Sequence, residues 1–185
     1  VLLTQRFITL TRWGLQFYYE QGIPRKKLCQ MYNPFDVTEF DRRSVEPVRN
    51  VLLEDGALYV IQVGSLREHK RPDLAIEAFK LAKRVVPNLK LILAGSGPLH
   101  DALREKVTTE RLVESVQLIG QSQCIPALLK RCHIGLSVSR SEGQGHCFLE
   151  YMAAGSPVVS WAMPGIGDEI VTNNLHGMIL PTPSP

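Results

Sequence analysis

The fold of this chain is decided by the stretch Ser139-Arg-Ser-Glu142-Gly-Gln-Gly145-His-Cys-Phe-Leu-Glu150-Tyr-Met-Ala-Ala-Gly155-Ser-Pro157-Val-Val159. An apolar run, 134–138, precedes it, so the order strand, glycine-bearing loop, helix, strand is predicted. A glycine loop that opens a helix exposes backbone N–H groups, and the helix dipole adds partial positive charge at that end. Such a turn suits a phosphorylated ligand, and flanking carboxylates suit its hydroxyl groups. Phosphates together with hydroxyls describe a nucleotide-sugar.

Outward from this stretch, short apolar runs alternate with helical patterns from residue 58 onward. Strands are predicted at 58–63, 89–94, 116–119, 134–138, 157–160 and 178–180. Helices are predicted at 72–86, 99–107, 125–132 and 147–154, with a short one near 168–171. Continuously apolar strands that are each followed by a helix imply a parallel sheet covered on both faces. The predicted fold class is therefore α/β, a Rossmann-like parallel sheet with helices on both faces.

Four loops follow predicted strands, at 64–70, 95–98, 120–123 and 142–147. Ligands of parallel α/β sheets bind outside the carboxyl ends of the strands, at the point where the strand order reverses. We therefore expect the four loops to share one site. The Gly-Ser-Gly-Pro turn that begins at Gly95 fits either a tight structural turn or a loop that faces a nucleotide.

The first part of the chain has a different pattern. A strand is predicted over Val1 to Thr4, a helix over Phe7 to Glu20, and a further strand over Leu28 to Tyr32. Aromatic side chains on the helix predict packing in a core or at a domain interface; they are Trp13, Phe17, Tyr18 and Tyr19. The segment 41–56 is polar and has little apolar content, which is typical of a mobile linker.

Composition narrows the class of protein. The 185 residues are 44% hydrophobic and 21% charged, with a net charge of +3, which is ordinary for a globular domain and lacks the dense basic stripe of a nucleic-acid binder. The four cysteines form no C-x-x-C pair or metal-ligand spacing, so we expect a cytoplasmic location. A peripheral contact at the cytoplasmic face of a membrane stays open. Without an initiator methionine, the sequence is interpreted as part of a longer chain.

The stretch from Ser139 resembles the E-x7-E signature of retaining glycosyltransferases with the GT-B fold, in particular family 4, whose motif runs S-x-x-E-G-F-G-x-x-x-x-E-A-M-A-x-G-x-P-V-V. Most positions match, and the departures are Gln144 for the usual aromatic residue and Tyr151 for the usual alanine. The resemblance covers roughly residues 25–182 and implies a domain organisation. Its parts are the end of an amino-terminal domain and the interdomain junction over 1–40, the polar linker over 41–56, and a carboxyl-terminal Rossmann-like nucleotide-sugar-binding domain, truncated at its end, over 57–185.

The resemblance also implies roles for single residues. Lys70 matches the lysine of the family's G-R-L-x-x-x-K motif, which contacts the donor diphosphate, while Glu142 would approach the sugar hydroxyls and Glu150 the ribose hydroxyls. Lys70 and Glu142 are thus the implied catalytic residues. Ser65 stands where the family has an arginine, and the neighbouring arginines of that loop are candidate substitutes. The implied donor-binding set is Gly64, Ser65, Lys70, Gly95, Gly97, Glu142, Gly143, Gly145, His146, Cys147, Phe148 and Glu150.

By this resemblance the chain is the donor-binding half of a retaining glycosyltransferase, which moves a sugar from a nucleotide diphosphate sugar to a glycan or lipid-linked acceptor. The acceptor would be bound mainly by an amino-terminal domain outside this sequence, so we expect little transfer by this part alone. No cofactor and no metal are expected. Two alternatives remain: a non-catalytic nucleotide or nucleotide-sugar binding module, favoured by Ser65, and a nicotinamide-dependent dehydrogenase, which rests only on Gly95 and Gly97.

Overall fold

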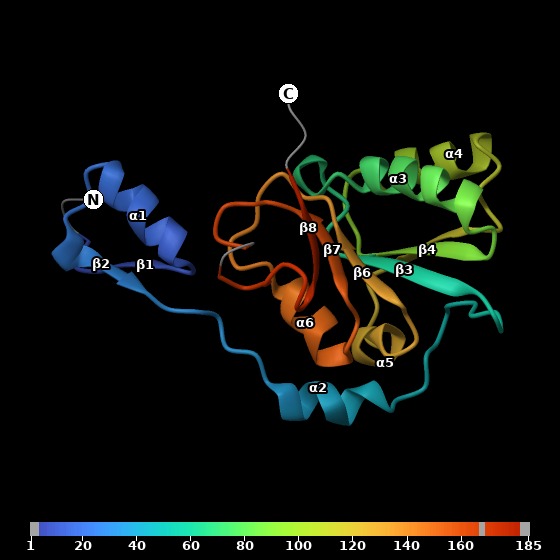
Figure 1. Cartoon of the computed structure of the whole chain (residues 1–185), viewed down its shortest axis with the longest axis horizontal. Helices are drawn as coiled ribbons and strands as arrows, with labels where there is room; N and C mark the ends of the chain where they lie inside the picture. Colours follow the sequence, from blue (N-terminus) through green and yellow to red (C-terminus); the bar gives the residue numbers. More distant parts are fainter. Residues whose placement is uncertain (1–3, 167–168, 182–185) are drawn as a thin grey trace.

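A computed structural model, which describes residues 4–166 and 169–181, contains a six-stranded parallel sheet at its centre (Figure 1). The order of the strands is β5-β4-β3-β6-β7-β8, and every neighbouring pair is parallel. The predicted α/β class is therefore confirmed. The strands are β3 (Leu58–Val63), β4 (Leu89–Ala94), β5 (Val116–Gly120), β6 (Ile134–Ser137), β7 (Val158–Trp161) and β8 (Gly177–Leu180).

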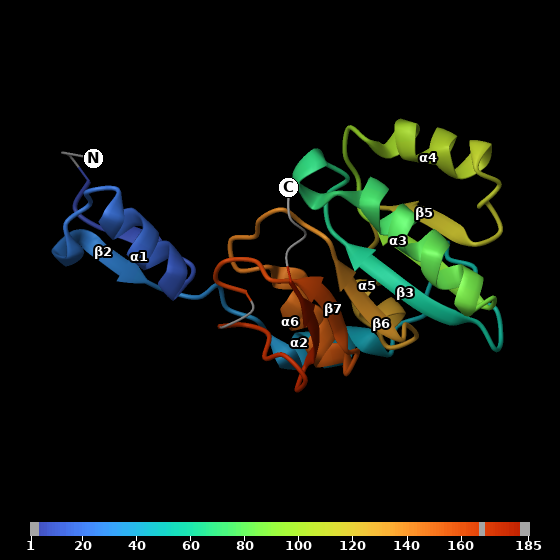
Figure 2. The same ribbon diagram turned by 45° about the horizontal axis from the view of Figure 1, so that its top comes forward.

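Helices cover both faces of this sheet because its strands send apolar side chains to both sides (Figures 1 and 2). Leu91 and Leu93 of β4 pack with α3 and α4, whereas Ile92 and Ala94 pack with α5 and α6. The helices are α2 (Val37–Ser44), α3 (Pro72–Val85), α4 (His100–Thr109), α5 (Ile125–Leu129) and α6 (His146–Ala154). Strand order reverses between β3 and β6, so their carboxyl ends mark the switch point of the sheet.

A tyrosine side chain bridges β3 and β6 near this switch point. The two strands pair only as far as Ile61 and Gly135. Beyond that pair, the main-chain N–H of Val63 donates to the Tyr151 hydroxyl at 2.9 Å, and the hydroxyl donates to the Leu136 carbonyl at 3.1 Å. Gly135 makes this possible, since a Cβ there would lie 2.3 Å from the Tyr151 ring. The phenol therefore replaces the missing hydrogen bonds of the ladder.

The N-terminal unit, residues 4–32, lies to one side of the sheet and is joined to it by the junction, residues 33–36 (Figure 1). It contains the parallel pair β1 (Phe7–Thr9) and β2 (Leu28–Gln30), the helix α1 (Arg12–Glu20) and the 3-10 turn η1 (Arg25–Lys27). The prediction of a helix from Phe7 was wrong for its first residues, which form β1. Helix α1 begins only after Thr11, whose Oγ1 accepts a hydrogen bond from Gly14 N at 3.1 Å.

The aromatic residues of α1 are not in the core of this chain. Trp13 and Phe17 stack with their ring centroids 5.2 Å apart, yet their exposed fractions are 48% and 39%. The expected strand over Val1 to Thr4 lies outside the described residues except for Thr4, which is not in a strand. The short helix expected near Asp168 also begins outside them, and the described residues that follow form a turn.

The segment 41–56, expected to be a polar linker, begins within a helix. Its first four residues belong to α2, whose mostly polar sequence carries no clear apolar period. Asp36 caps α2 by accepting from Glu39 N at 2.9 Å, and Phe40 anchors it in the core. The remainder packs on the core through Val48, Val51 and Leu53.

Candidate functional site

The switch point brings together the two residues implied to be catalytic. Lys70 ends the 3-10 turn η2 (Glu68–Lys70) after β3, and Glu142 follows β6. The Lys70 Nζ atom lies 2.6 Å from both carboxylate oxygens of Glu142, and their side chains are only 18% and 7% exposed. A largely buried pair of this kind is costly to break, because the remaining charge would be left without a partner. An anion that binds here would have to compete with Glu142 for the ammonium group.

Gln62 supports the main chain at Lys70 and was not identified from the sequence. Its side chain lies in β3, is buried, and donates from Nε2 to the Lys70 carbonyl at 2.9 Å. Its Oε1 has no hydrogen-bond donor among the described residues. The only sequence signal was a polar residue within an apolar strand, which by itself does not indicate a partner.

The glycine turn after β4 packs against the loop that carries Lys70. A Cβ on Gly95 would lie 1.8 Å from the Gly64 carbonyl oxygen, and one on Gly97 would lie 2.4 Å from that of Leu66. The loops are joined by Gly64 N to the Ala94 carbonyl and by Leu66 N to the Ser96 carbonyl, each 2.9 Å. Close approach of two main chains accounts for both glycines without a ligand.

The arginines near Ser65 do not replace the missing family arginine in an evident way. Arg71 stacks over the Trp161 ring, with its guanidinium carbon 5.0 Å from the ring centroid. Arg67 is exposed, and no side-chain bond ties it to the described part of the site. Lys70 is therefore the cation that the structure places beside Glu142.

The glycine loop, residues 142–145, opens α6 as the sequence predicted. Gly145 has φ 67° and ψ 66° at the N-cap, and a Cβ there would lie 2.4 Å from the Phe148 ring. Within the described residues, the N–H groups of His146 and Cys147 have no main-chain acceptor. Phe148 belongs to the implied donor-binding set, but its N–H already donates to the Gly145 carbonyl at 2.9 Å. The helix end presents N–H groups toward the space beside the loop.

Cys147 is not suited to act as a nucleophile. Its side chain is buried, and burial, with a smaller contribution from the nearby Glu142 charge, raises the pKa of the thiol to about 12. The thiolate fraction at neutral pH is then negligible. His146 is exposed, and its ring centroid lies 5.5 Å from that of Phe35 in the junction.

Glu150 faces a cavity of about 340 Å³ between α2, α6 and the loop after β5. Burial raises the pKa of its carboxyl group, and the Arg43 guanidinium partly offsets that effect. No hydrogen-bond donor to this carboxylate is found among the described residues, so its acceptor capacity is unused. The lining comprises Phe35, Asp36, Glu39, Phe40, Arg43, Gln121, Ser122, Gln123, Ile125, Pro126, His146 and Glu150.

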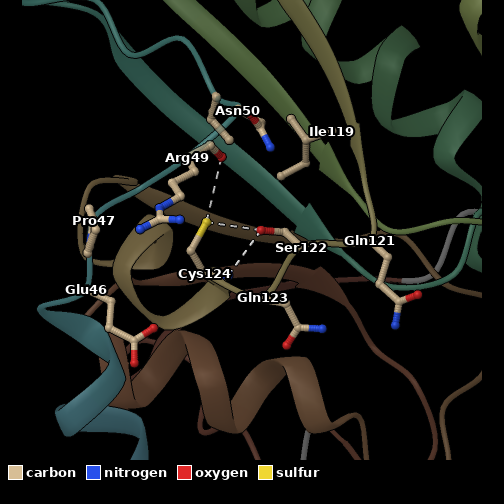
Figure 3. A pocket seen from close by; sticks show the side chains of 10 residues that line it. Glu46, Pro47, Arg49, Asn50, Ile119, Gln121, Ser122, Gln123 and Cys124 are labelled. Carbon is tan, nitrogen blue, oxygen red and sulfur yellow. Dashed lines mark hydrogen bonds between the residues drawn. The ribbon is translucent and has the colours of Figure 1, made fainter.

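A second cavity, of about 550 Å³, shares the loop 121–123 with the first. It lies between that loop and the segment 46–51 (Figure 3). Cys124 N donates to Ser122 Oγ at 3.2 Å, which holds the loop in a tight turn. The loop after β5 was predicted from the sequence, whereas no periodic signal marked the segment 46–51 or Arg43, which line these cavities.

Among the described residues, no three His, Cys, Asp or Glu side chains are grouped so that they could hold a metal ion. No helix in the described part of the chain is long and apolar enough to cross a membrane.

Comparisons with known proteins match most of the chain to one family. Residues 45–185 match the family model "Glycosyl transferases group 1". One relative is the GtfA subunit of the UDP-N-acetylglucosamine–peptide N-acetylglucosaminyltransferase of Streptococcus agalactiae. The two chains are 26% identical over 132 residues, and this alignment covers 71% of this chain and 26% of that protein. The chain is 29% identical over 167 residues to the amylovoran biosynthesis glycosyltransferase AmsK of Erwinia amylovora, covering 84% of this chain and 41% of that protein.

Solved structures share the fold. Anabaena HepE in complex with UDP and glucose superposes with a TM-score of 0.78 at 20% identity, covering 96% of this chain and 50% of that chain. TarM superposes with a TM-score of 0.79 at 19% identity, covering 96% of this chain and 33% of that chain. The chain thus spans half or less of the proteins named here.

Proposed function

Because this chain belongs to the family of glycosyl transferases group 1, we propose that it is the donor-binding half of a retaining, family 4 glycosyltransferase. The complete enzyme would transfer a sugar from a nucleotide diphosphate sugar to a glycan or lipid-linked acceptor, with an amino-terminal domain binding the acceptor. The main support for this proposal is that Lys70 contacts Glu142 at the switch point, where the loop that begins with Glu142 leads into α6. We also propose a cytoplasmic location, with peripheral membrane contact left to experiment.

In the proposed reaction, the bond between the anomeric carbon and the diphosphate oxygen breaks, and the electron pair leaves with the diphosphate. Negative charge therefore grows on the leaving group, while positive charge grows on the sugar ring. An acceptor hydroxyl oxygen forms the new bond to the anomeric carbon, and its proton passes to the leaving diphosphate. Lys70 would stabilise the leaving group with its ammonium charge, and the N–H groups at the start of α6 would add fixed dipoles. Glu142, which lies beside Lys70, would accept hydrogen bonds from sugar hydroxyls.

The ribose is assigned to Glu150 on the basis of its unused acceptor capacity. A ribose offers two neighbouring hydroxyl donors, and a half-buried carboxylate without donors of its own is complementary to them. The adjoining loop 121–123 lines both cavities and is our proposed neighbour of the base.

Calorimetric titration of the chain with UDP, GDP and ADP tests the proposal. We expect one nucleotide to bind best and Glu150→Ala to weaken it by roughly 10- to 100-fold, as for loss of hydrogen bonds to a charged group. The matched control is Glu105→Ala on the exposed side of α4, which should bind like the native chain. Equal affinity of Glu150→Ala and the control would remove the ribose role. No binding of any nucleotide by the native chain would count against a donor site in this chain.

The affinity for the preferred nucleotide should depend on pH through Glu150. Ribose hydroxyls donate to the ionised carboxylate. The affinity should therefore be highest above the pKa that Glu150 has in the unliganded chain, and it should fall as the pH drops through that pKa. Because burial raises that pKa, the fall should begin at a higher pH than for an ordinary glutamate, whose pKa is about 4.3. Titrations between pH 8 and pH 5 would measure it. Glu150→Gln should show weaker binding without this fall; an unchanged pH profile in that variant would assign the dependence to another group.

One observation favours the alternative of a non-catalytic nucleotide or nucleotide-sugar binding module. Ser65 removes one expected phosphate cation, and Arg71 is engaged with Trp161. Labelled nucleotide-sugar offered to the longer protein separates the two functions, since a module would bind it without releasing the nucleotide.

A further inference from the structure

Gln144, the departure from the family's aromatic residue, ties the glycine loop to the junction. Asn33 N donates to Gln144 Oε1 at 2.5 Å, and Gln144 Nε2 donates to the Asn33 carbonyl at 3.2 Å. The Gln144 side chain is 4% exposed, whereas Asn33 is exposed, so the two bonds join a buried amide group to the surface of the junction. One amide side chain therefore satisfies both main-chain groups of a residue 111 positions away.

Contacts of neighbouring residues also join the region of the glycine loop to the segments that precede α2. Two residues after Asn33, the Phe35 ring lies 5.5 Å from the ring of His146, which is two residues after Gln144. On the other side of Gln144, a Cβ on Gly143 would come within 3.3 Å of Leu10 in the N-terminal unit. The glycine loop and the start of α6 thus contact both the N-terminal unit and the junction.

A second contact fixes the N-terminal unit beside the same edge of the sheet. The Glu169 carboxylate accepts from Arg12 N, at 2.8 and 2.9 Å to its two oxygens, and from the Tyr32 hydroxyl at 2.6 Å. Glu169 therefore holds the start of α1 and the end of the unit just before Asn33. The junction cannot leave the glycine loop without breaking the bonds to Gln144, and Glu169 holds the residue just before it.

We propose that Gln144 is a positioning residue, which sets the glycine loop against the junction and so makes nucleotide affinity depend on its amide group. The inference rests on the proposed function, since it assigns the nucleotide diphosphate to this loop. Its physical reason is that the loop's N–H groups act on an anion only when they are held in one arrangement. Loss of the clamp would let the loop sample other arrangements, at the expense of affinity.

A second glutamine that binds the main chain through both atoms of its amide group provides a control. Gln117 in β5 makes the same pair of bonds to the main chain of Leu52, at 3.0 Å from Leu52 N and 2.7 Å to its carbonyl. Gln144→Met and Gln117→Met each remove a two-bond clamp while keeping side-chain length. A purely structural role predicts that neither substitution changes the nucleotide affinity of the folded chain.

The test measures nucleotide affinity by calorimetry and exchange of the Asn33 amide hydrogen by NMR. We expect Gln144→Met to bind its preferred nucleotide roughly 10-fold more weakly, with faster exchange at Asn33, and Gln117→Met to match the native chain in both. Equal affinity in the two variants, or unchanged exchange at Asn33 in Gln144→Met, would overturn the proposal. Absence of nucleotide binding by the native chain would instead refute the proposed function, and exchange at Asn33 would still decide whether the clamp exists.

Discussion

Replacing Tyr151 with alanine is expected to lower the free energy of unfolding by about 3 to 5 kcal/mol, the usual cost of truncating a buried aromatic side chain. The ring is fully buried in the core between α6 and the sheet. Its loss would leave a cavity beside Gly135 and leave the Val63 N–H and the Leu136 carbonyl without their shared partner. Chemical denaturation monitored by circular dichroism measures the effect. A loss below about 1 kcal/mol would contradict the bridging role.

Two further variants separate the hydroxyl from the ring. Tyr151→Phe should cost about 1 to 3 kcal/mol, because the two main-chain groups stay buried without partners. The exposed Tyr19→Phe is its control and should leave stability unchanged.

Gly135→Ala gives the sharpest check of this packing. In the native chain, the added Cβ would lie 2.3 Å from the Tyr151 ring, and overpacking of this kind typically costs 1 to 3 kcal/mol or more. In the Tyr151→Ala background the clash is gone, so the same substitution should cost little. Additive losses in the double variant would show that the two positions do not contact each other.

Replacing Lys70 with alanine is expected to weaken binding of the preferred nucleoside diphosphate by roughly 10- to 100-fold and to leave binding of the free nucleoside unchanged. The reason is that Lys70 is proposed to contact the diphosphate and not the base or ribose. Calorimetry with both ligands measures the difference. Lys26→Ala in η1 is the matched control, since this exposed lysine lies in the N-terminal unit. Equal losses for nucleoside and diphosphate would indicate a general collapse of the site.

Glu142→Gln, unlike Lys70→Ala, should not weaken the binding of the nucleoside diphosphate. The substitution removes the carboxylate that holds Lys70 Nζ at 2.6 Å, so the ammonium group becomes freer to bind phosphate. Affinity for the nucleoside diphosphate should therefore hold or rise, while affinity for the nucleotide-sugar falls because a sugar contact is lost. Weaker binding of the nucleoside diphosphate would mean that Glu142 holds Lys70 in place and does not compete for it.

The strands of the sheet and most of the helices that cover it could be predicted, because each produces a local pattern of apolar residues in the sequence. Continuous apolar runs gave β3 and β4 at their observed bounds, and the glycine loop gave the start of α6 within one residue. The placement of loops at one edge followed from parallel strands alone. Helix α2 was missed because its stability depends on a cap and a single buried residue, Phe40, and β1 was taken for helix because three residues carry no clear period.

The sequence by itself determined the α/β class, the glycine loop and the identity of Lys70, Glu142 and Glu150 as candidates. Only the tertiary structure decided which of these meet, since the bonds of Lys70 to Glu142 and of Gln144 to Asn33 join positions 72 and 111 residues apart. It also decided that Gln62 supports Lys70 and that Tyr151 fills the space left by Gly135. Local periodicity records which face of an element is buried, whereas partners across the sheet are selected by how the elements pack.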